Sequence, residues 1–552
     1  MTSSIAAPAR RSRRSPRSLD LRELGARARN IARALPSLIW KQAELAGVSV
    51  MIGAGVVAHA WNLFSYPRYQ GDEGVYMSAA WAVAHGQIYP YTYTYGHPPL
   101  GWILIAAWCQ LTGGFFTFGT AINTGRVLML VIYALSALFV YLIARKIAGS
   151  VWPALLAVAL FSFSPLGVYF QREVLLDNFA ACWMLLSFYL LVASESRMRW
   201  IIASALAFGA AVLSKETVVI FLPVFVYGVW LEASAFQRRY MVTVFGYLTI
   251  ALPSLFVLAA ALKNELFPSG TLLGGSNPHV SMIETFFLQA GRGSNQGSFE
   301  EQWTFWQHTD GLLILGGLAT IAANLVIGWR RPVYRVIALL PLIYLLFLAR
   351  GGVTFAYYII PLIPLLALSI ALCVYEVIAF IARARWWRQW TVGSWMAPAV
   401  ALIALVALLP SDLQLNNTNF TANETGPQYA AIQWMGEHVP RSATIIVSHY
   451  EWLDMRSVGG LGATYGAPFD YVEMYWVVAT DPAIGGGVFH NDWRNVDYIM
   501  ADSDTFIDAN GFHMTLLLTA LRHAVPIAKF QNKWYWVTIY QVQHDTSSAA
   551  SP

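Results

Sequence analysis

The chain has 552 residues, of which 57% are hydrophobic and only 12% are charged, and its mean hydropathy is +0.50. A soluble domain carries about 25% charged residues, so the composition excludes an ordinary soluble protein and places most of the chain in lipid. The net charge of +5 is concentrated in an arginine-rich N-terminal segment and does not indicate a nucleic-acid partner. The three cysteines all lie in apolar runs, without metal-ligand spacing or a disulfide framework.

The first 43 residues are basic, and their early part is rich in Ser and Pro. We expect residues 1–43 to form a cytoplasmic arm that contacts anionic membrane lipids. A transit peptide would have a similar composition, but arginines continue up to the first apolar segment, which favours the arm.

Twelve apolar segments follow, and a helix that spans a bilayer needs about 20 mostly apolar residues. They are 44–64, 98–112, 124–147, 151–170, 176–193, 199–214, 217–233, 241–262, 311–329, 334–349, 355–382 and 396–411.

The basic loops decide which of these segments cross. Short cytoplasmic loops are enriched in Lys and Arg, and five loops between the segments carry clusters of basic residues. All five lie on the side of the N-terminal arm only if one segment between residues 64 and 124 does not cross. The segment 98–112 is short, begins with Pro-Pro and ends in Gly-Gly, so we expect a re-entrant or interfacial helix there. The sequence therefore predicts about eleven spans, with the N-terminus cytoplasmic and the C-terminus extracytoplasmic.

The same arrangement places two long loops and the tail outside. The loops are 65–123 and 263–310, and the second reads either as a mobile flap or as a plain connector. The fold class expected is an α-helical polytopic membrane domain over 44–411, followed by an extracytoplasmic α/β domain over 412–552. In that tail the pattern predicts helices at 427–438 and 514–523 and strands at 443–448, 496–500 and 534–542.

Charged residues lie close to the helix ends on the outer side. A charge at membrane depth costs at least about 2.5 kcal/mol, so such residues usually face a cavity. The alternative is that each charge only anchors a span at the headgroups or pairs with its neighbour in sequence. Because four separate turns contribute, we expect them to converge at one outward-facing mouth. The residues are Asp72, Glu73, Arg172, Glu173, Asp177, Lys215, Glu216 and Arg350.

This set of side chains suits sugar transfer from a lipid carrier. A carboxylate can act as the general base on an acceptor hydroxyl group, and cations can stabilise a phosphate leaving group. The aromatic run that ends at Tyr95 offers stacking surfaces for sugars. Outside the cytoplasmic membrane there is no pool of nucleotide sugars, so a glycosyl donor there has to arrive attached to a lipid.

Several motifs occur in an order that resembles the GT-C glycosyltransferases. They are GDEGVYMSAAW, HPPLGW, REVLLD, SKET and FAYYIIPLIPLLAL. The most similar branch is that of the protein O-mannosyltransferases and lipid A aminoarabinose transferases, and the resemblance covers about residues 45–410. It implies a GT-C fold, a polyprenyl- or dolichyl-phosphate sugar donor and inversion at the anomeric carbon.

The resemblance also assigns roles to residues of this chain. Asp72 is the expected catalytic carboxylate, with Glu73 beside it and Asp177 as a second acidic position. Lys215, Arg172 and Arg350 are the expected ligands of the donor phosphate. Substrate contacts are expected from Tyr95, His97, Glu173, Glu216 and Tyr358.

Two positions depart from the family pattern. The aminoarabinose branch usually has Lys immediately before Pro-Pro, where this chain has His97, and other branches often have an acidic residue before that His, where this chain has Gly96. No cofactor is assigned, and the need for a divalent metal stays open.

The sequence therefore predicts an inverting hexosyl- or pentosyltransferase of the plasma membrane and cell envelope, with a lipid, polysaccharide or protein acceptor. A transporter or flippase of a lipid-linked sugar is the alternative, although no internal repeat is evident and the charges gather at one face rather than at mid-membrane. An oligosaccharyltransferase catalytic subunit is disfavoured, because no WWDYG-type signature is present and Trp386-Trp387 falls in an inner loop.

Overall fold

The computed structural model describes residues 21–91, 95–274, 280–291, 297–383, 414–456, 471–481 and 483–544, with 399, 403 and 469; the side chains of 21–40 and 383 are not included. The chain divides into two compact units, residues 1–50 and 51–552. The first helix, α1 (Leu21–Ala60), begins inside the segment expected to be an arm. The expected last span, 396–411, lies almost wholly outside the described residues, as does most of the basic cluster before it.

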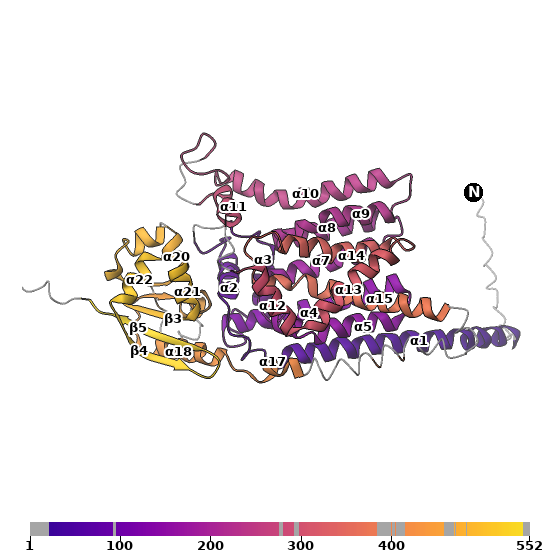
Figure 1. Ribbon diagram of the computed structural model, residues 1–552, viewed down its shortest axis with the longest axis horizontal. Helices are drawn as coiled ribbons and strands as arrows, with labels where there is room; N and C mark the ends of the chain where they lie inside the picture. Colours follow the sequence, from indigo (N-terminus) through magenta and orange to yellow (C-terminus); the bar gives the residue numbers. More distant parts are fainter. Residues whose placement is uncertain are drawn as a thin grey trace, which may run out of the picture. The chain divides into compact units, whose positions relative to one another are not determined.

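In the described residues, a bundle of helices forms the larger part of the second unit (Figure 1). Helix α4 packs on α5, α7 and α15, α8 lies between α7 and α10, and α14 contacts α9, α13 and α15. The helices are α4 (Ala121–Ala148), α5 (Val151–Phe163), α7 (Leu176–Val192), α8 (Met198–Ser214), α9 (Leu222–Glu232), α10 (Arg238–Leu262), α13 (Gly311–Ile327), α14 (Val333–Leu348) and α15 (Leu362–Arg383).

Four helical stretches in the described part are long and apolar enough to cross a membrane. A fifth results if α12 (Phe299–Thr309) and α13, which meet at a bend of 109°, are taken as one span. Five apolar helices of 10–17 residues lie beside them. The fold is thus mostly helical and of the membrane type, as expected, whereas the number of eleven spans stays a prediction.

The basic loops meet at one end of the helices. Lys146, after α4, pairs with Glu195, after α7, at 2.7 Å, and the Ser196 hydroxyl donates to the carbonyl oxygen of Glu232, at the end of α9. Arg331, between α13 and α14, pairs with Glu376 of α15. These loops are the ones in which the sequence placed its basic clusters.

Two short helices lie in the loop expected to be outside, α2 (Gly71–Ala84) and α3 (Leu100–Thr112). The 13 residues of α3 extend for about 20 Å, which is too short for a hydrocarbon core of about 30 Å. It packs against α2, α4, α7 and α8. Gly101 permits this packing, because a Cβ atom there would lie 2.3 Å from the Leu176 side chain. Its length favours the re-entrant or interfacial helix expected for 98–112.

The C-terminal part contains a five-stranded mixed sheet in the order β2-β1-β3-β5-β4. Strand β1 pairs in parallel with β2 and β3, and β5 runs antiparallel to β3 and β4. Three of the strands and two of the helices lie where the sequence predicted them; β2, β4, α19, α20 and α21 were not predicted. The elements are α17 (Asn417–Thr421), α18 (Thr425–His438), β1 (Thr444–Val447), α19 (His449–Arg456), β2 (Tyr471–Met474), α20 (Tyr475–Thr480), β3 (Tyr498–Asp502), α21 (Ser503–Gly511), α22 (Thr515–Arg522), β4 (Ala524–Gln531) and β5 (Trp536–Val542).

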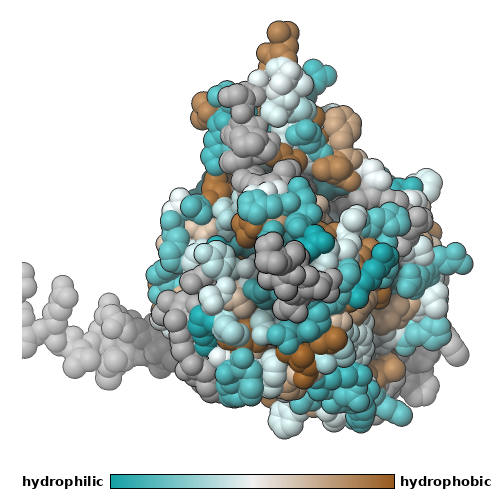
Figure 2. All heavy atoms as spheres, turned by 90° about the vertical axis from the view of Figure 1, so that its left-hand side faces the viewer, coloured by the Kyte–Doolittle hydropathy of each residue, from teal (hydrophilic) through white to brown (hydrophobic). Residues whose placement is uncertain are grey.

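This C-terminal part, residues 414–544, packs on the end of the bundle that carries α2 (Figure 1). Tyr69 and Gln428 exchange two hydrogen bonds, of 2.8 and 3.0 Å. The backbone N–H of Ala121 donates to Asp454 at 3.3 Å, and Arg68 pairs with Asp504 at 2.9 Å. Hydrophilic side chains predominate on the face that looks away from the bundle (Figure 2).

Glu451 of α19 makes the C-terminal part sensitive to pH. Its side chain is fully buried, and burial, followed by the carboxylate of Asp502, raises the pKa of Glu451 well above its usual value. A raised pKa in the folded state gives stability that is complete below the unfolded pKa, near 4.5, and is lost as the pH rises through the folded pKa.

We therefore expect Glu451→Gln to become more stable relative to the wild type as the pH rises from 5 to 9. Each kcal/mol of difference corresponds to roughly 2–4 °C in Tm for a chain of about 150–250 residues, and to less for a longer chain. Thermal unfolding at pH 5, 7 and 9 measures the Tm difference between the variant and the wild type. The control variant is Glu437→Gln, which alters an exposed glutamate. A Tm difference that does not change with pH would contradict the assignment.

Candidate active site

Asp72 lies in the first turn of α2, at the end of the bundle that meets the C-terminal part. The hydroxyl group of Tyr357 donates a hydrogen bond of 2.7 Å to its carboxylate. Tyr357 belongs to a short 3-10 turn, Ala356–Ile359, whose Ala356 carbonyl accepts a hydrogen bond from the indole of Trp306 on α12. The second outer loop, through Trp306, therefore fixes the turn that contains Tyr357, and Tyr357 in turn fixes Asp72.

Lys215 lies between α8 and the 3-10 turn Glu216–Phe221 and is almost wholly buried. Its Nζ atom is 3.5 Å from Oδ2 of Asp177, in the first turn of α7, and 3.3 Å from Nε2 of His97. The other ring nitrogen of His97 is 3.1 Å from a carboxylate oxygen of Glu216. Three of the residues expected at the mouth, together with His97, which was expected to contact substrate, thus form one continuous chain of contacts. The alternative pairing between sequence neighbours is not seen for Lys215 and Glu216.

Aromatic rings join this chain to Asp72. The rings of Tyr357 and Tyr358 are both centred 5.9 Å from Nζ of Lys215. The phenol of Tyr76, one turn after Asp72 on α2, interacts electrostatically with Asp72, Lys215 and Asp177. Tyr358 was expected at the site; Tyr357 was not, although it stands in the same aromatic run.

Arg350 lies at the rim of this cluster. Its guanidinium is exposed and donates to the carbonyl oxygen of Phe347 at 2.9 Å. Tyr344 lies within electrostatic range of Arg350, and also of Asp177 and Lys215. An exposed cation at the rim can move onto a bound phosphate without breaking a buried contact.

Glu73 takes a different place from its neighbour Asp72. It is fully buried, and its carboxylate receives hydrogen bonds of 2.9 and 2.7 Å from the guanidinium of Arg126, also fully buried. The backbone N–H groups of Val174 and Gln70 donate to the same carboxylate. Both oxygens are occupied by these donors, which favours a structural role for Glu73, and the catalytic role expected from the sequence stays a prediction.

Arg172 and Glu173 also turn away from the cluster. The guanidinium of Arg172 is buried and donates to the carbonyl oxygens of Ala58 and Asn419, at 2.9 and 3.0 Å. Glu173 is buried beside the Glu73–Arg126 pair, and burial raises its pKa well above the usual value. The contacts of Arg172 thus join it to the C-terminal part rather than to Lys215, and the phosphate and substrate roles expected for Arg172 and Glu173 stay predictions.

Tyr95 links the site to the second outer loop. Its hydroxyl group donates to Glu265, and the backbone carbonyl of Gly96 accepts from Gln289 of α11 (Met282–Ala290) at 2.6 Å. The two residues before His97 are thus tied to the loop read as either a flap or a connector, which contains α11 and α12.

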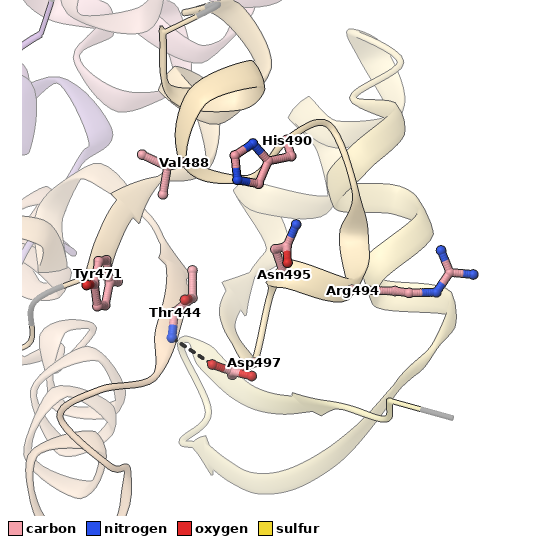
Figure 3. A pocket seen from close by; sticks show the side chains of 7 residues that line it. All are labelled: Thr444, Tyr471, Val488, His490, Arg494, Asn495 and Asp497. Carbon is pink, nitrogen blue, oxygen red and sulfur yellow. Dashed lines mark hydrogen bonds between the residues drawn. The ribbon is translucent and has the colours of Figure 1, made fainter. Parts of the chain in front are cut away.

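The structure also has a surface hollow of about 410 Å³ on the C-terminal part (Figure 3). Thr444, Asp497, His490 and Arg494 are among its lining residues, and the Thr444 N–H donates to Asp497 at 2.8 Å. None of the residues expected at the site lines it. Among the described residues no group of three or more His, Cys, Asp or Glu side chains is arranged to hold a metal ion.

Solved structures with a similar fold are glycosyltransferases. The oligosaccharyltransferase of Archaeoglobus fulgidus, in its apo form, has a TM-score of 0.57 at 14% identity, and the match covers 91% of this chain and 75% of that one. ArnT from Cupriavidus metallidurans, bound to undecaprenyl phosphate, has a TM-score of 0.52 at 17% identity, with 92% and 99% covered. The chain has the fold of the GT-C glycosyltransferases, and the resemblance expected from the sequence is confirmed at this level.

Residues 96–262 match the model of the family described as dolichyl-phosphate-mannose-protein mannosyltransferase. The matched segment contains His97, Asp177, Lys215 and Glu216, and ends before Arg350. No curated protein matches the sequence.

Proposed function

We propose that this protein is a membrane glycosyltransferase that moves a sugar from a polyprenyl-phosphate carrier to an acceptor hydroxyl group, with inversion at the anomeric carbon. The observation that carries the proposal is the meeting of Asp72 and Lys215 around the ring of Tyr357. A carboxylate and a cation that are far apart in the sequence lie at the same end of the bundle. The matched family and the undecaprenyl phosphate bound to ArnT support a lipid-phosphate donor.

The reaction needs one base and one anion-stabilising group. Asp72 takes the proton of the acceptor hydroxyl as its oxygen attacks the anomeric carbon from the face opposite the phosphate. The bond from that carbon to the phosphate oxygen breaks, and its electron pair leaves on the phosphate. Lys215, with Arg350 at the rim, stabilises the developing charge. The products are the glycosylated acceptor and polyprenyl phosphate.

Tyr357 and Asp177 position these two groups. The Tyr357 hydroxyl donates a hydrogen bond of 2.7 Å to Asp72 and so fixes the orientation of its carboxylate. Asp177 and His97 hold the ammonium of Lys215 in a site with almost no solvent contact. His97, Glu216 and Tyr358 are left to contact the sugar or the acceptor.

The site belongs on the extracytoplasmic side of the plasma membrane in this proposal. The loops that carry the basic clusters lie at the other end of the helices, and cytoplasmic loops are the ones enriched in Lys and Arg. An arrangement of about eleven spans with the C-terminal part outside, as a separate α/β domain, agrees with this placement.

Transfer of label from a polyprenyl-phosphate sugar by the purified protein in vesicles tests the function. We expect glycosylated product and free polyprenyl phosphate to appear together, and we expect Lys215→Met to lower the rate by about 10²-fold. The control variant is Lys533→Met, an exposed lysine on the C-terminal part. Movement of the lipid-linked sugar across the vesicle membrane without release of polyprenyl phosphate would contradict the transferase and support the transporter.

A further inference from the structure

The C-terminal part reaches the first turn of α2, where Asp72 lies. Helix α19 packs on α2. A Cβ atom on Gly74 would lie 2.2 Å from the backbone oxygen of His449, and one on Gly71 would lie 3.6 Å from its Nδ1 atom. The two glycines that flank Asp72 therefore leave room for His449, the first residue of α19.

The imidazole of His449 is buried but keeps one nitrogen without a partner. The residue is 8% exposed, and its Nδ1 has no hydrogen-bond partner among the described residues. A buried polar atom without a partner costs about 1–3 kcal/mol, so it is retained where it has a task. Its position against Gly71 directs this nitrogen toward the turn that carries Asp72.

Other contacts fix α19 in place, so His449 cannot easily move away. The hydroxyl group of Tyr450 donates to Asp502 at 3.0 Å, and the indole of Trp452 donates to the carbonyl oxygen of Val472 at 3.0 Å. The ring of Tyr475 packs edge-on against His449, with centroids 5.2 Å apart.

The surroundings keep this histidine neutral. Burial lowers the pKa of His449 to about 4, and the carboxylates of Asp72 and Asp502 offset only part of that effect. Tyr475, whose ring packs against His449, donates a hydrogen bond from its hydroxyl group to Asp508 at 2.6 Å. A neutral imidazole can donate from Nδ1 to an ionised carboxylate without carrying a charge of its own.

We infer that His449 is a positioning residue for Asp72: the C-terminal part brings its unpartnered Nδ1 to the turn that carries Asp72, and in the substrate-bound site its Nδ1–H donates to the carboxylate oxygen that Tyr357 does not hold. The inference rests on the proposed role of Asp72 as the base. Tyr357 already holds one carboxylate oxygen of Asp72, and a second donor from α19 would fix the orientation of the carboxylate toward the acceptor. The C-terminal part is in this way a component of the active site.

The test compares His449→Leu, which removes the donor, with His449→Asn, whose amide replaces Nδ1. In the full-length protein we expect His449→Leu to lower kcat by up to about 10²-fold, with the KM of the donor unchanged, and His449→Asn to retain most of the activity. The pH profile of kcat is measured in both variants, and we expect it to differ from that of the wild type in the leucine variant only.

A kcat and pH profile of His449→Leu equal to those of the wild type would overturn the inference, as would an equal loss in both variants. The function itself is judged separately by Asp72→Asn in the same assay. If that variant is inactive while His449→Leu is normal, only the role of His449 fails; if Asp72→Asn transfers sugar normally, the base assignment fails with it.

Discussion

Asp72→Asn is expected to lower sugar transfer from a polyprenyl-phosphate donor by about 10²- to 10⁴-fold, the usual contribution of a general base. The amide keeps the size of the side chain and can still bond to the hydroxyl group of Tyr357, but it cannot take the proton of the acceptor. Donor binding should persist, because the cation of Lys215 is unchanged. Single-turnover transfer and donor binding, measured on the same preparation, separate a loss of the chemical step from a loss of donor affinity.

Two further variants make the result specific. Tyr357→Phe removes only the hydrogen bond that positions the carboxylate, so an intermediate loss is expected. Asp492→Asn alters an exposed carboxylate on the C-terminal part that bonds only within its own turn, and its transfer rate should equal that of the wild type. Transfer by Asp72→Asn at the wild-type rate would refute the role of Asp72.

The sequence predicted the site best where one physical rule decided the outcome. The basic loops fixed which helix ends share a side, and Asp72, Asp177, Lys215 and Glu216 all lie at helix starts or turns on the opposite side. Their convergence follows from that rule alone, without any knowledge of how the helices pack. The same rule required one segment between residues 64 and 124 not to cross. Segment 98–112 was chosen because its length and its Pro-Pro start do not suit a span.

The rule says nothing about the partner of each charge. Glu73 and Asp72 are adjacent, yet one turn of α2 directs Glu73 to a buried arginine and Asp72 to the mouth. Arg172 shares its turn with Glu173, but its guanidinium meets backbone carbonyl groups of Ala58 and Asn419. Asn419 is 247 residues away. Such pairings depend on contacts between segments distant in sequence, which periodicity and composition do not record.

The C-terminal part was the least predictable for the same reason. Its strands β1, β3 and β5 are regular apolar runs and were recognised, but α19 is polar and short, and it is buried by its packing on α2, α4, α18 and β2. Nothing in the local sequence distinguishes such a helix from an exposed loop. The contact of His449 with α2 was therefore invisible before the structure.

Arg126→Met is expected to give the largest loss of stability, about 3–5 kcal/mol, because it leaves a buried charge without its partner. The guanidinium of Arg126 bonds to Glu73 and to the carbonyl oxygens of Leu63, Pro67 and Arg68 at 2.9–3.1 Å. Methionine fills much of the volume but provides none of these donors. The carboxylate of Glu73 and three backbone oxygens would then be buried without a cation.

Thermal unfolding in detergent measures the effect, and Arg239→Met, which alters an exposed arginine at the start of α10, is the matched control. The double variant with Glu73→Gln should recover part of the loss, because it removes the unpaired charge while its single amide oxygen can still accept from one of the two N–H groups, that of Gln70 or that of Val174. If Arg126→Met lowered Tm no more than the control does, Glu73 would have another role than holding α2 to α4. The catalytic role expected for Glu73 would then be favoured.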